Sequence, residues 1–473
     1  MTNSGVIISS PAEGSSGDGL PAGWVRATLE ELGVEAQPGF ASGKHNRDGN
    51  GVAHLRPMNI TRSGVIDLSD ARYVADETGR RVEFGDVLFN NTNSPVLVGK
   101  TAWVDSVEPL AYSNHMTRLR APEGLDSKFL AVQLHWLWAS GYFKTVLNNH
   151  VNQASVASKA LLATSLVIPP LPEQRRIVAK LDRQIAHIEA GESAVKSAED
   201  MVSVLWAGVL EAVARGNAVS GISEPPTRAV AEVTVVSGGI QKSGKRKPVD
   251  NKFPFLRVAN VPRGSLDLSD VHDIELFEGE IEKHRLGFGD LLVVEGNGSP
   301  DQIGRAAMWR EEIKDCVHQN HLIRVRPGVS IVPEFLELVW NSPSVSAQLR
   351  AVAHTTSGLY TLSTAKVKSV MIPVPTVADQ EILVAKARDS RERINAAASM
   401  VAEAAAQAVT LRGALLRAAF TGKLVPQDSA DEHASVLLDR IRAAREAAAK
   451  SPRKRAPRKP RKSAGPGQEE LPQ

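Results

Sequence analysis

The sequence predicts an α+β protein: two mixed α/β domains separated by two long helices that form an antiparallel coiled coil, related by a pseudo-twofold internal repeat. Three observations support this prediction. A proline-rich junction leading into a long helical pattern occurs twice, several short segments recur in the same order, and the two helical patterns share one register. The repeat length of about 205 residues is too long for a solenoid, so a whole domain-plus-helix unit is duplicated.

The composition is that of a globular protein large enough for two or three domains. The chain has 473 residues, of which 42% are hydrophobic and 23% charged. No apolar run approaches the ~18 residues of a membrane span. Cys316 is the only cysteine, which excludes an intrachain disulfide and a thiolate metal cluster and fits a reducing, cytoplasmic location. No metal site is predicted.

Positive charge is concentrated at the C-terminus. The chain has a net charge of +3, but residues 450–473 carry eight Lys and Arg against two Glu. The rest of the chain is therefore slightly acidic, at −3. Binding to nucleic acid would require local basic patches rather than overall charge.

The first domain is predicted at residues 24–171, after a flexible leader at residues 1–23. The leader is rich in Ser and Gly and lacks the apolar core of a signal peptide. The expected elements of the domain are a polar Gly/Asn loop at 39–51, strands at 52–56 and 82–89, a polar loop at 90–93 and a helix at 129–147.

The second domain, residues 228–375, follows a linker at residues 217–227 and repeats the first domain in order. Four segments match at offsets of 200 to 206 residues: Phe255–Asn260 repeats His54–Asn59, Leu266–Asp270 repeats Ile66–Asp70, Phe288–Leu292 repeats Phe84–Leu88, and Gln319–Arg326 repeats Ser113–Arg120. The shared order predicts that both domains have one fold.

The spacer helices are predicted at residues 172–216 and 376–422. In both, apolar residues alternate steps of three and four, the heptad pattern of a coiled coil, and adding 206 to the first stripe gives the second. We expect the two stripes to pack on each other. Their main seam positions are Ile177, Leu181, Ile188, Val195, Val202 and Leu205 in the first helix and Leu383, Ile394, Val401, Leu411 and Leu415 in the second.

Length predicts the direction of the helices. About 43 residues at ~1.5 Å per residue make a helix of roughly 64 Å, whereas a linker of about 12 residues spans at most ~42 Å. The linker alone cannot return the chain to the start of the first helix, so the second helix is expected to run antiparallel. The second junction has Thr376–Asp379 where the first has Leu171–Glu173, which puts the start of the second helix in doubt.

Two pieces are predicted after the second helix. Residues 423–449 contain a short amphipathic helix at Ser435–Arg442. Residues 450–473 form a basic tail, and their proline content and lack of core-forming residues predict disorder.

Two basic, glycine-flanked loops at corresponding places are candidates for contact with nucleic acid. Residues 239–245 have the spacing of a phosphate-binding loop, but Arg246 stands where a magnesium-binding hydroxyl is needed, so no nucleotide site is predicted. A flexible loop is the alternative, while basic side chains in both copies favour phosphates and base edges of DNA. The assigned residues are Lys44, His45, Asn46 and Arg47 in the first domain and Gln241, Lys242, Lys245 and Arg246 in the second.

A second candidate surface is formed by polar residues that follow the predicted strands. Asn can pair with adenine edges and Glu with cytosine, although a plain polar turn fits equally well. The assigned residues are Asn59, Asn90, Asn91 and Asn93 in the first domain and Asn260, Glu295, Asn297 and Tyr360 in the second. Differences between the copies are those expected of two domains that read different sequences.

No catalytic centre is predicted. The chain has no Asn-Pro-Pro-aromatic methyltransferase motif, no complete phosphate loop and no Gly-x-Ser-x-Gly elbow. His115 and His321 each follow an Asn and lack further ligands at metal spacing, so a structural role is favoured for both.

The ordered motifs resemble the specificity subunit of type I restriction–modification systems. They are Leu-Arg-x-x-Asn, Gly-Asp-Val/Leu-Leu, Ile-Pro and Glu/Asp-Gln before a long helix, each present twice, and residues 411–426 are similar to the family's ending of the second helix. The resemblance covers residues 24–445. It implies that each domain is a target-recognition domain that reads one half of a bipartite, asymmetric DNA sequence, and that the chain is not an enzyme.

The resemblance also implies partners. The helices would dock two modification subunits, which bind S-adenosylmethionine and methylate adenine. Restriction subunits that join such a complex use ATP and Mg to translocate and cut DNA, in defence against phage. This chain would bind no cofactor itself. The alternative is a non-catalytic coiled-coil adaptor that binds protein partners rather than specific DNA.

Overall fold

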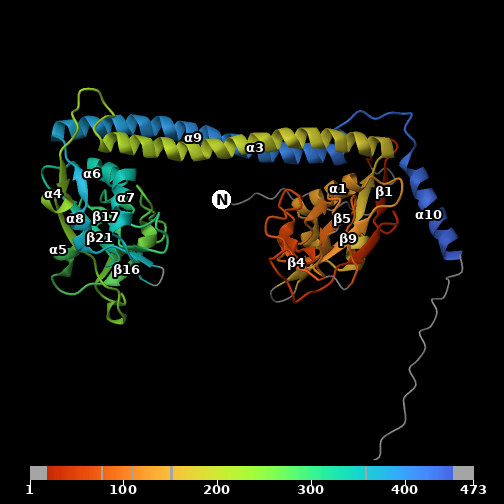
Figure 1. Cartoon of the computed structure of the whole chain (residues 1–473), viewed down its shortest axis with the longest axis horizontal. Helices are drawn as coiled ribbons and strands as arrows, with labels where there is room; N and C mark the ends of the chain where they lie inside the picture. The colour runs from red at the N-terminus through yellow and green to blue at the C-terminus, as the bar shows by residue number, and fades with distance from the viewer. Residues whose placement is uncertain (1–18, 76–77, 109, 150–152, 357–358, 451–473) are drawn as a thin grey trace, which may run out of the picture. The chain divides into compact units, whose positions relative to one another are not determined.

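The computed structural model describes residues 19–75, 78–108, 110–149, 153–356 and 359–450. Its contacts divide the chain into two compact units, whose elements are labelled in Figure 1. Unit 1 comprises Met1–Glu189 with Val409–Gln473, and unit 2 comprises Ala190–Ala408. Each long helix therefore contributes one part to unit 1 and the rest to unit 2.

The described residues of unit 1 form four small sheets, with strand orders β2-β9-β5-β7, β4-β3-β8, β10-β11-β6 and β1-β12. Their strands are β1 Val25–Thr28, β2 Glu35–Pro38, β3 Val52–Leu55, β4 Arg72–Val74, β5 Val87–Asn90, β6 Thr92–Asn93, β7 Thr101–Trp103, β8 Ala111–Tyr112, β9 Met116–Arg120, β10 Asn148–Asn149, β11 Ala154–Ser155 and β12 Ser165–Ile168. Its shorter helices are α1 Ser127–Ala139, α2 Ser158–Leu162 and α10 Ala434–Lys450, with 3-10 turns η1 Pro57–Asn59 and η2 Tyr142–Thr145.

Unit 2 repeats this plan, with strand orders β14-β21-β17-β19, β16-β15-β20, β18-β23-β22 and β13-β24. Its strands are β13 Thr227–Ala229, β14 Thr234–Gly238, β15 Lys252–Leu256, β16 His272–Glu275, β17 Leu291–Val294, β18 Gly296–Asn297, β19 Ala306–Met308, β20 Val317–His318, β21 Leu322–Pro327, β22 His354–Thr356, β23 Leu359–Thr361 and β24 Met371–Pro373. Its shorter helices are α4 Val230–Val233, α5 Glu280–His284, α6 Pro333–Trp340, α7 Pro343–Val352 and α8 Thr364–Ser369, with 3-10 turns η3 Gly244–Arg246 and η4 Val258–Asn260.

The sheets confirm the internal repeat. Each unit has one four-stranded, two three-stranded and one two-stranded sheet among its described residues. The pair β3–β8 is parallel in unit 1, and so is the corresponding pair β15–β20 in unit 2. One main core in each unit joins the four-stranded sheet to the domain helices and to the nearby part of the long helices.

Two predicted elements are shorter in the structure. The strand expected at 82–89 begins only at Val87, because Asp86 caps a turn by accepting the amide of Glu83 at 2.8 Å and Gly85 has a φ of 88°. The helix expected at 129–147 ends at Ala139. Gly141 has a φ of 87°, a left-handed conformation that ends a helix readily only at glycine.

The long helices have matched ends. Helix α3 is Leu171–Ala214 and helix α9 is Val377–Phe420, each of 44 residues and 206 positions apart at both ends. The doubt about the start of the second helix is thereby removed. Thr376 caps it by accepting the amide of Asp379 at 3.2 Å, and its hydroxyl donates to the Asp379 carboxylate at 2.6 Å.

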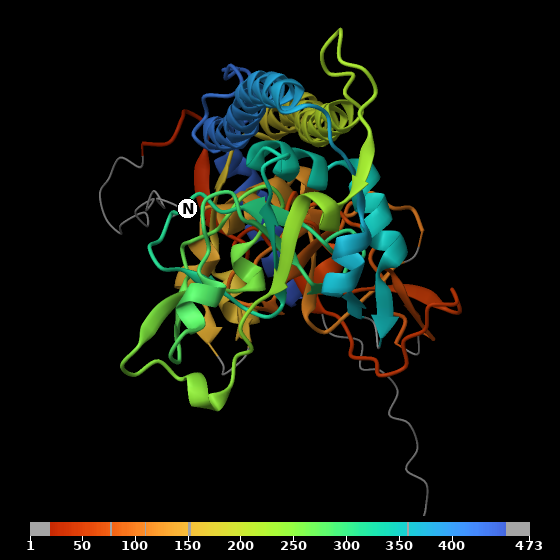
Figure 2. The ribbon, with the colours of Figure 1, turned by 90° about the vertical axis from the view of Figure 1, so that its left-hand side faces the viewer.

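The two helices run antiparallel, as predicted, in each unit taken by itself. In unit 1 the start of α3, at Ile177 and Leu181, shares a buried cluster with Phe420 at the end of α9. In unit 2 the end of α3, at Val213, shares a cluster with Leu383 near the start of α9. Figure 2 views unit 2 from its end and shows the two helices side by side along one face of the domain.

The heptad seam is wrong at two equivalent positions. Leu205 and Leu411 have 51% and 57% of their surfaces exposed, while the next residues, Trp206 and Arg412, are partly covered. A straight α-helix repeats about every 3.6 residues, so a strict 3.5 pattern drifts round its surface. The remaining seam positions are covered: Ile177, Leu181, Ile188 and Leu383 are buried, and Val195, Val202, Ile394, Val401 and Leu415 are half-buried.

One buried glutamine locks each long helix to its domain. Gln174 of α3 accepts the amide of Asp126 at 2.8 Å and donates to the carbonyl of Pro169 at 2.9 Å. Gln380 of α9 accepts the amide of Val332 at 2.7 Å and donates to carbonyl oxygens nearby. Both glutamines are 0% exposed. Their side chains are therefore directed into the domains rather than along the seam.

Cys316 is buried in unit 2 beside β20. Burial raises the pKa of its thiol to about 12. The thiol is therefore protonated at neutral pH, consistent with a packing role.

Candidate nucleic-acid interface

A glycine starts each basic loop where the chain crosses a neighbouring strand end. A side chain at Gly39 would collide with the backbone of Tyr112 and Ser113, and one at Gly239 with the backbone of His318 and Gln319. Each loop then forms a single parallel bridge to that segment. In unit 2 the loop lies at the end of the domain remote from the long helices (Figures 1 and 2).

In unit 1 the loop is organised by Asn46. Its amide donates to the carbonyls of Asn50 and Tyr73, and its side-chain oxygen accepts the amides of Asp48 and Asn50. All of these contacts lie within the protein, so Asn46 shapes the loop. Its neighbours Lys44, His45 and Arg47 are exposed.

Two of these neighbours already have contacts. Arg47 lies 3.6 Å from the exposed carboxylate of Asp70, a weak surface pair that a phosphate could replace. Nε2 of His45 lies 3.0 Å from Nδ1 of His54. No ion pair involves Lys44 within the described part of the chain, which leaves its ammonium available.

In unit 2 the predicted loop residues divide into two groups. Arg246 forms a bidentate ion pair with Glu280, at 2.7 Å for both contacts, and lies over the Phe277 ring at 4.7 Å. This hydrogen bonding lowers the pKa of Glu280 to about 2, and Arg246 is committed to the loop's own structure. Gln241, Lys242 and Lys245 are exposed.

The polar segment after β5 is a strand rather than the predicted loop. Thr92–Asn93 pairs with Ala154–Ser155, which pairs in turn with Asn148–Asn149. Asn90 is fully buried and donates to the carbonyl of Leu97 at 2.9 Å. Asn91 and Asn93 are half-buried, with Asn91 accepting the hydroxyl of Thr117 at 3.1 Å.

The equivalent sheet of unit 2 brings two predicted residues together. Asn297 of β18 is in register with Tyr360 of β23. Glu295, one residue before β18, lies 3.2 Å from Nδ1 of the exposed His321. Sequence reasoning missed this His–Glu pair because the two residues are 26 positions apart.

Asn59 and Asn260 are structural residues in both units. Each is nearly inaccessible and accepts the backbone amide of the arginine three positions earlier, at 2.9 Å from Arg56 and 2.8 Å from Arg257. Each also donates to a carbonyl, of Asp67 or Asp267. The prediction that Asn59 and Asn260 contact DNA is therefore wrong. Their side chains, like that of Asn90, are buried inside the protein.

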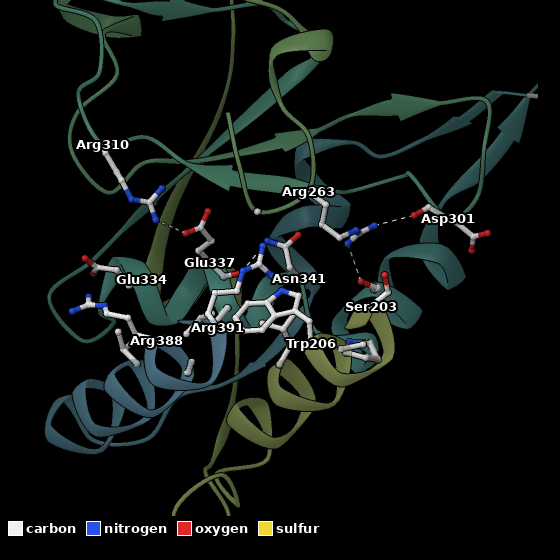
Figure 3. Close-up of a pocket in the computed structure, with 18 of the residues that line it drawn as sticks. Ser203, Trp206, Arg263, Asp301, Arg310, Glu334, Glu337, Asn341, Arg388 and Arg391 are labelled. Carbon is white, nitrogen blue, oxygen red and sulfur yellow. Dashed lines mark hydrogen bonds and ion pairs between the residues drawn. The ribbon is translucent and has the colours of Figure 1, made fainter. Parts of the chain in front are cut away.

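Each unit also has a cleft between its domain and the long helices. In unit 2 the cleft measures about 780 Å³ (Figure 3). Arg391 of α9 lies over the ring of Trp206 of α3 at 4.4 Å, and Arg310 pairs with Glu337 of α6 at 2.7 Å. These contacts line the walls of the cleft with both charges.

The smaller cleft of unit 1, about 350 Å³, contains the equivalent positions. Lys128 of α1 and Asp182 of α3 form an ion pair at 2.8 Å, where unit 2 has Glu334 and Arg388 206 positions later, with both signs reversed. Aligning the two halves at the helix offset of 206 would have revealed this exchange of charge. In each unit, the residues that line the cleft come from both the domain and the long helices.

Comparison with known proteins finds similarity to DNA specificity domains. The family model described as type I restriction modification DNA specificity domain matches residues 73–195. A chain from a structure described as the basis of complex assembly and conformational transition of the type I R-M system matches with a TM-score of 0.66 at 20% identity. That match covers 86% of this chain and 99% of the other.

Two relatives match over most of their length. The EcoKI type I restriction enzyme specificity subunit of Escherichia coli K12 is 26% identical, covering 90% of this chain and 97% of the relative. The StySPI specificity subunit of Salmonella potsdam is 23% identical, covering 83% and 88%. The chain is similar to type I restriction–modification specificity subunits over most of its length.

Among the described residues, no cluster of His, Cys, Asp or Glu could hold a metal ion. The helices in that part of the chain also include none with the length and apolar character needed to cross a membrane.

Proposed function

We propose that this chain is the DNA sequence-recognition subunit of a type I restriction–modification complex, with unit 1 and unit 2 each reading one half of a bipartite, asymmetric target. The observation that carries the proposal is a shared scaffold with divergent loops. The glycine-anchored loops occupy the same place in both units, yet their exposed side chains differ: Lys44, His45 and Arg47 against Gln241, Lys242 and Lys245. Such a pair of loops would read two different half-sites.

We assign the methylation and cleavage reactions to partner subunits rather than to this chain. As a specificity subunit it would select the sequence, in the cytoplasm, while modification subunits supply S-adenosylmethionine and adenine methylation. Restriction subunits with ATP and Mg would complete the assembly.

Phosphate contacts by the unit 2 loop are tested by removing its lysines. Lys242→Ala and Lys245→Ala should weaken binding about equally on all DNA sequences, because a phosphate carries no sequence information. Each should also reduce the slope of log affinity against log salt by about 1. Fluorescence anisotropy over a salt series measures both quantities.

Lys386→Ala provides the control, because Lys386 is an exposed lysine on α9. It should change neither affinity nor slope. A wild-type protein whose DNA binding did not depend on salt would contradict the proposal and favour the alternative of a protein-binding adaptor.

The exposed leucines of the long helices are proposed as docking positions for two copies of the modification subunit. Leu205 in unit 2 and Leu411 in unit 1 are equivalent in the repeat and both more than half exposed. Met201, one helical turn before Leu205 and also exposed, extends the apolar patch in unit 2. Two equivalent patches suit two copies of one partner.

Leu205→Glu and Leu411→Glu should therefore each remove one modification subunit. Burial of a leucine side chain in the interface with the partner contributes about 1.5–3 kcal/mol to binding. Its loss therefore weakens binding at that patch by roughly 10- to 100-fold. Native mass spectrometry of the assembled complex should show one copy in place of two. Val329→Glu, at a fully exposed loop position, should leave two copies bound, and two copies on both leucine variants would refute the docking assignment.

A further inference from the structure

Three aromatic rings in a row, each tilted against the next by 44–48°, support the basic loop of unit 1. The rings of Phe40 and His54 lie 4.8 Å apart, and those of His54 and His45 lie 5.1 Å apart. His54 is only 2% exposed, whereas His45 is exposed. The row of rings therefore leads from the interior of the domain to the surface that we assign to DNA.

Hydrogen bonds along this row of rings determine which ring nitrogens carry protons. Nε2 of His54 lies 3.3 Å from the carbonyl oxygen of Phe40, and a carbonyl only accepts, so this nitrogen must be protonated. In a neutral ring Nδ1 of His54 is then an acceptor. Nε2 of His45, 3.0 Å away, must donate to it. Nδ1 of neutral His45 is consequently an acceptor, and none of the described residues bonds to it.

The surroundings keep both rings neutral. Burial lowers the pKa of His54, and the neighbouring His45 lowers it further, against the opposing effect of the Phe40 and Tyr112 carbonyls. Burial also lowers the pKa of His45, with additional repulsion from Arg56 and Arg72. The acceptor at Nδ1 therefore persists at pH values where a free histidine would begin to protonate.

We propose that His45 is a specificity-determining residue of unit 1: its Nδ1 accepts a hydrogen bond from the exocyclic amino group of adenine or cytosine in the major groove, and His54 is the positioning residue that fixes its tautomer and ring orientation. This inference rests on the proposed DNA-recognition function. Adenine and cytosine are the bases that present an amino donor in the major groove, so an unprotonated ring nitrogen matches them.

Unit 2 has a different arrangement at the same place. Arg246 and Phe255 stand 201 positions after His45 and His54. The guanidinium of Arg246 is held by Glu280, and Phe255 offers no ring nitrogen. The acceptor is therefore specific to unit 1, and only one half of the DNA target depends on it.

Selection from randomised duplex DNA by the full chain tests this inference. His45→Ala should reduce discrimination at one base pair of one half-site by about 5- to 150-fold. His45→Lys replaces the acceptor by donors, so the preference at that position should change from adenine to guanine or from cytosine to thymine on the same strand. These changes exchange an amino group for a carbonyl oxygen at the same point of the groove.

His54→Phe introduces the ring found in unit 2 and tests the positioning role. Discrimination should fall at the same base pair and at no other, by less than in His45→Ala, with the salt dependence unchanged because no phosphate contact is lost. Lys44→Ala is the contrasting variant: it should weaken binding evenly and reduce the salt slope by about 1.

The outcomes separate this inference from the function on which it rests. If the wild-type chain selected no sequence, the proposed function itself would fail. If the wild-type chain selected a sequence but His45→Lys left every position unchanged, or altered several positions in both halves, only the assignment of His45 would be overturned.

Discussion

Exchanging residues 228–371 for the corresponding segment of a relative is expected to change one half of the recognised DNA sequence completely and leave the other half as it is. The two ends of this segment meet in a single sheet, where Arg228 is in register with Ile372 and Ala229 with Met371. A grafted domain can therefore enter and leave at one place. Mapping methylated adenines after assembly with the modification subunits would measure the new sequence.

The attachment of the graft to α9 is also independent of its side chains. Gln380 bonds to the backbone amide of Val332 and to the backbone carbonyl of Ser330, so a different sequence with the same backbone is held equally well. Exchange of residues 26–167, whose ends are in register in β1 and β12, is the reciprocal control and should change the other half. A change in both halves, or in neither, from one exchange would contradict a two-reader protein.

Replacing Gln380 by alanine is expected to destabilise unit 2 by about 2–4 kcal/mol. The substitution removes hydrogen bonds to Val332, Ser330 and Pro375. Each buried backbone group that loses its partner costs about 1–3 kcal/mol, and the costs are not fully additive. Thermal or urea unfolding followed by circular dichroism would measure the change.

Gln174→Ala should have a similar effect on unit 1, because it leaves Asp126 and Pro169 without their partner. Gln407→Ala is the matched control, since Gln407 lies on the exposed side of α9 and bonds to the side chain of Glu403. It should change stability by less than about 0.5 kcal/mol. Equal stability of Gln380→Ala and Gln407→Ala would show that the buried glutamine does not lock the helix.

The repeat and the helices could be predicted from sequence because they depend on features that are local or appear twice. Proline has no amide hydrogen to donate to a strand ladder, and a long apolar stripe requires a helix, so the predicted starts at 172 and 376 lie within one residue of Leu171 and Val377. The two long helices keep the same register relative to their domains because Gln174 and Gln380 bond to equivalent parts of the two domains.

The details of the site depended on contacts that a single sequence does not display. Thr92 and Asn93 are a strand only because Ala154 and Ser155, some sixty residues later, pair with them. Asn59 and Asn46 have the same amide as a base-reading residue, yet both use it to shape the backbone. Leu205 was misplaced because heptad spacing and a straight helix agree near the middle of a stripe and diverge toward its end.

The single buried cysteine has a practical consequence. Cys316 is inaccessible, and its protonated thiol is a poor nucleophile, so a thiol reagent has no reactive target in folded unit 2. A cysteine introduced at any exposed position would therefore be labelled selectively on an otherwise natural background. A pair of such labels, one in each unit, would allow the distance between the units to be measured spectroscopically. The slow labelling of Cys316 itself would report the rate at which the core around it opens.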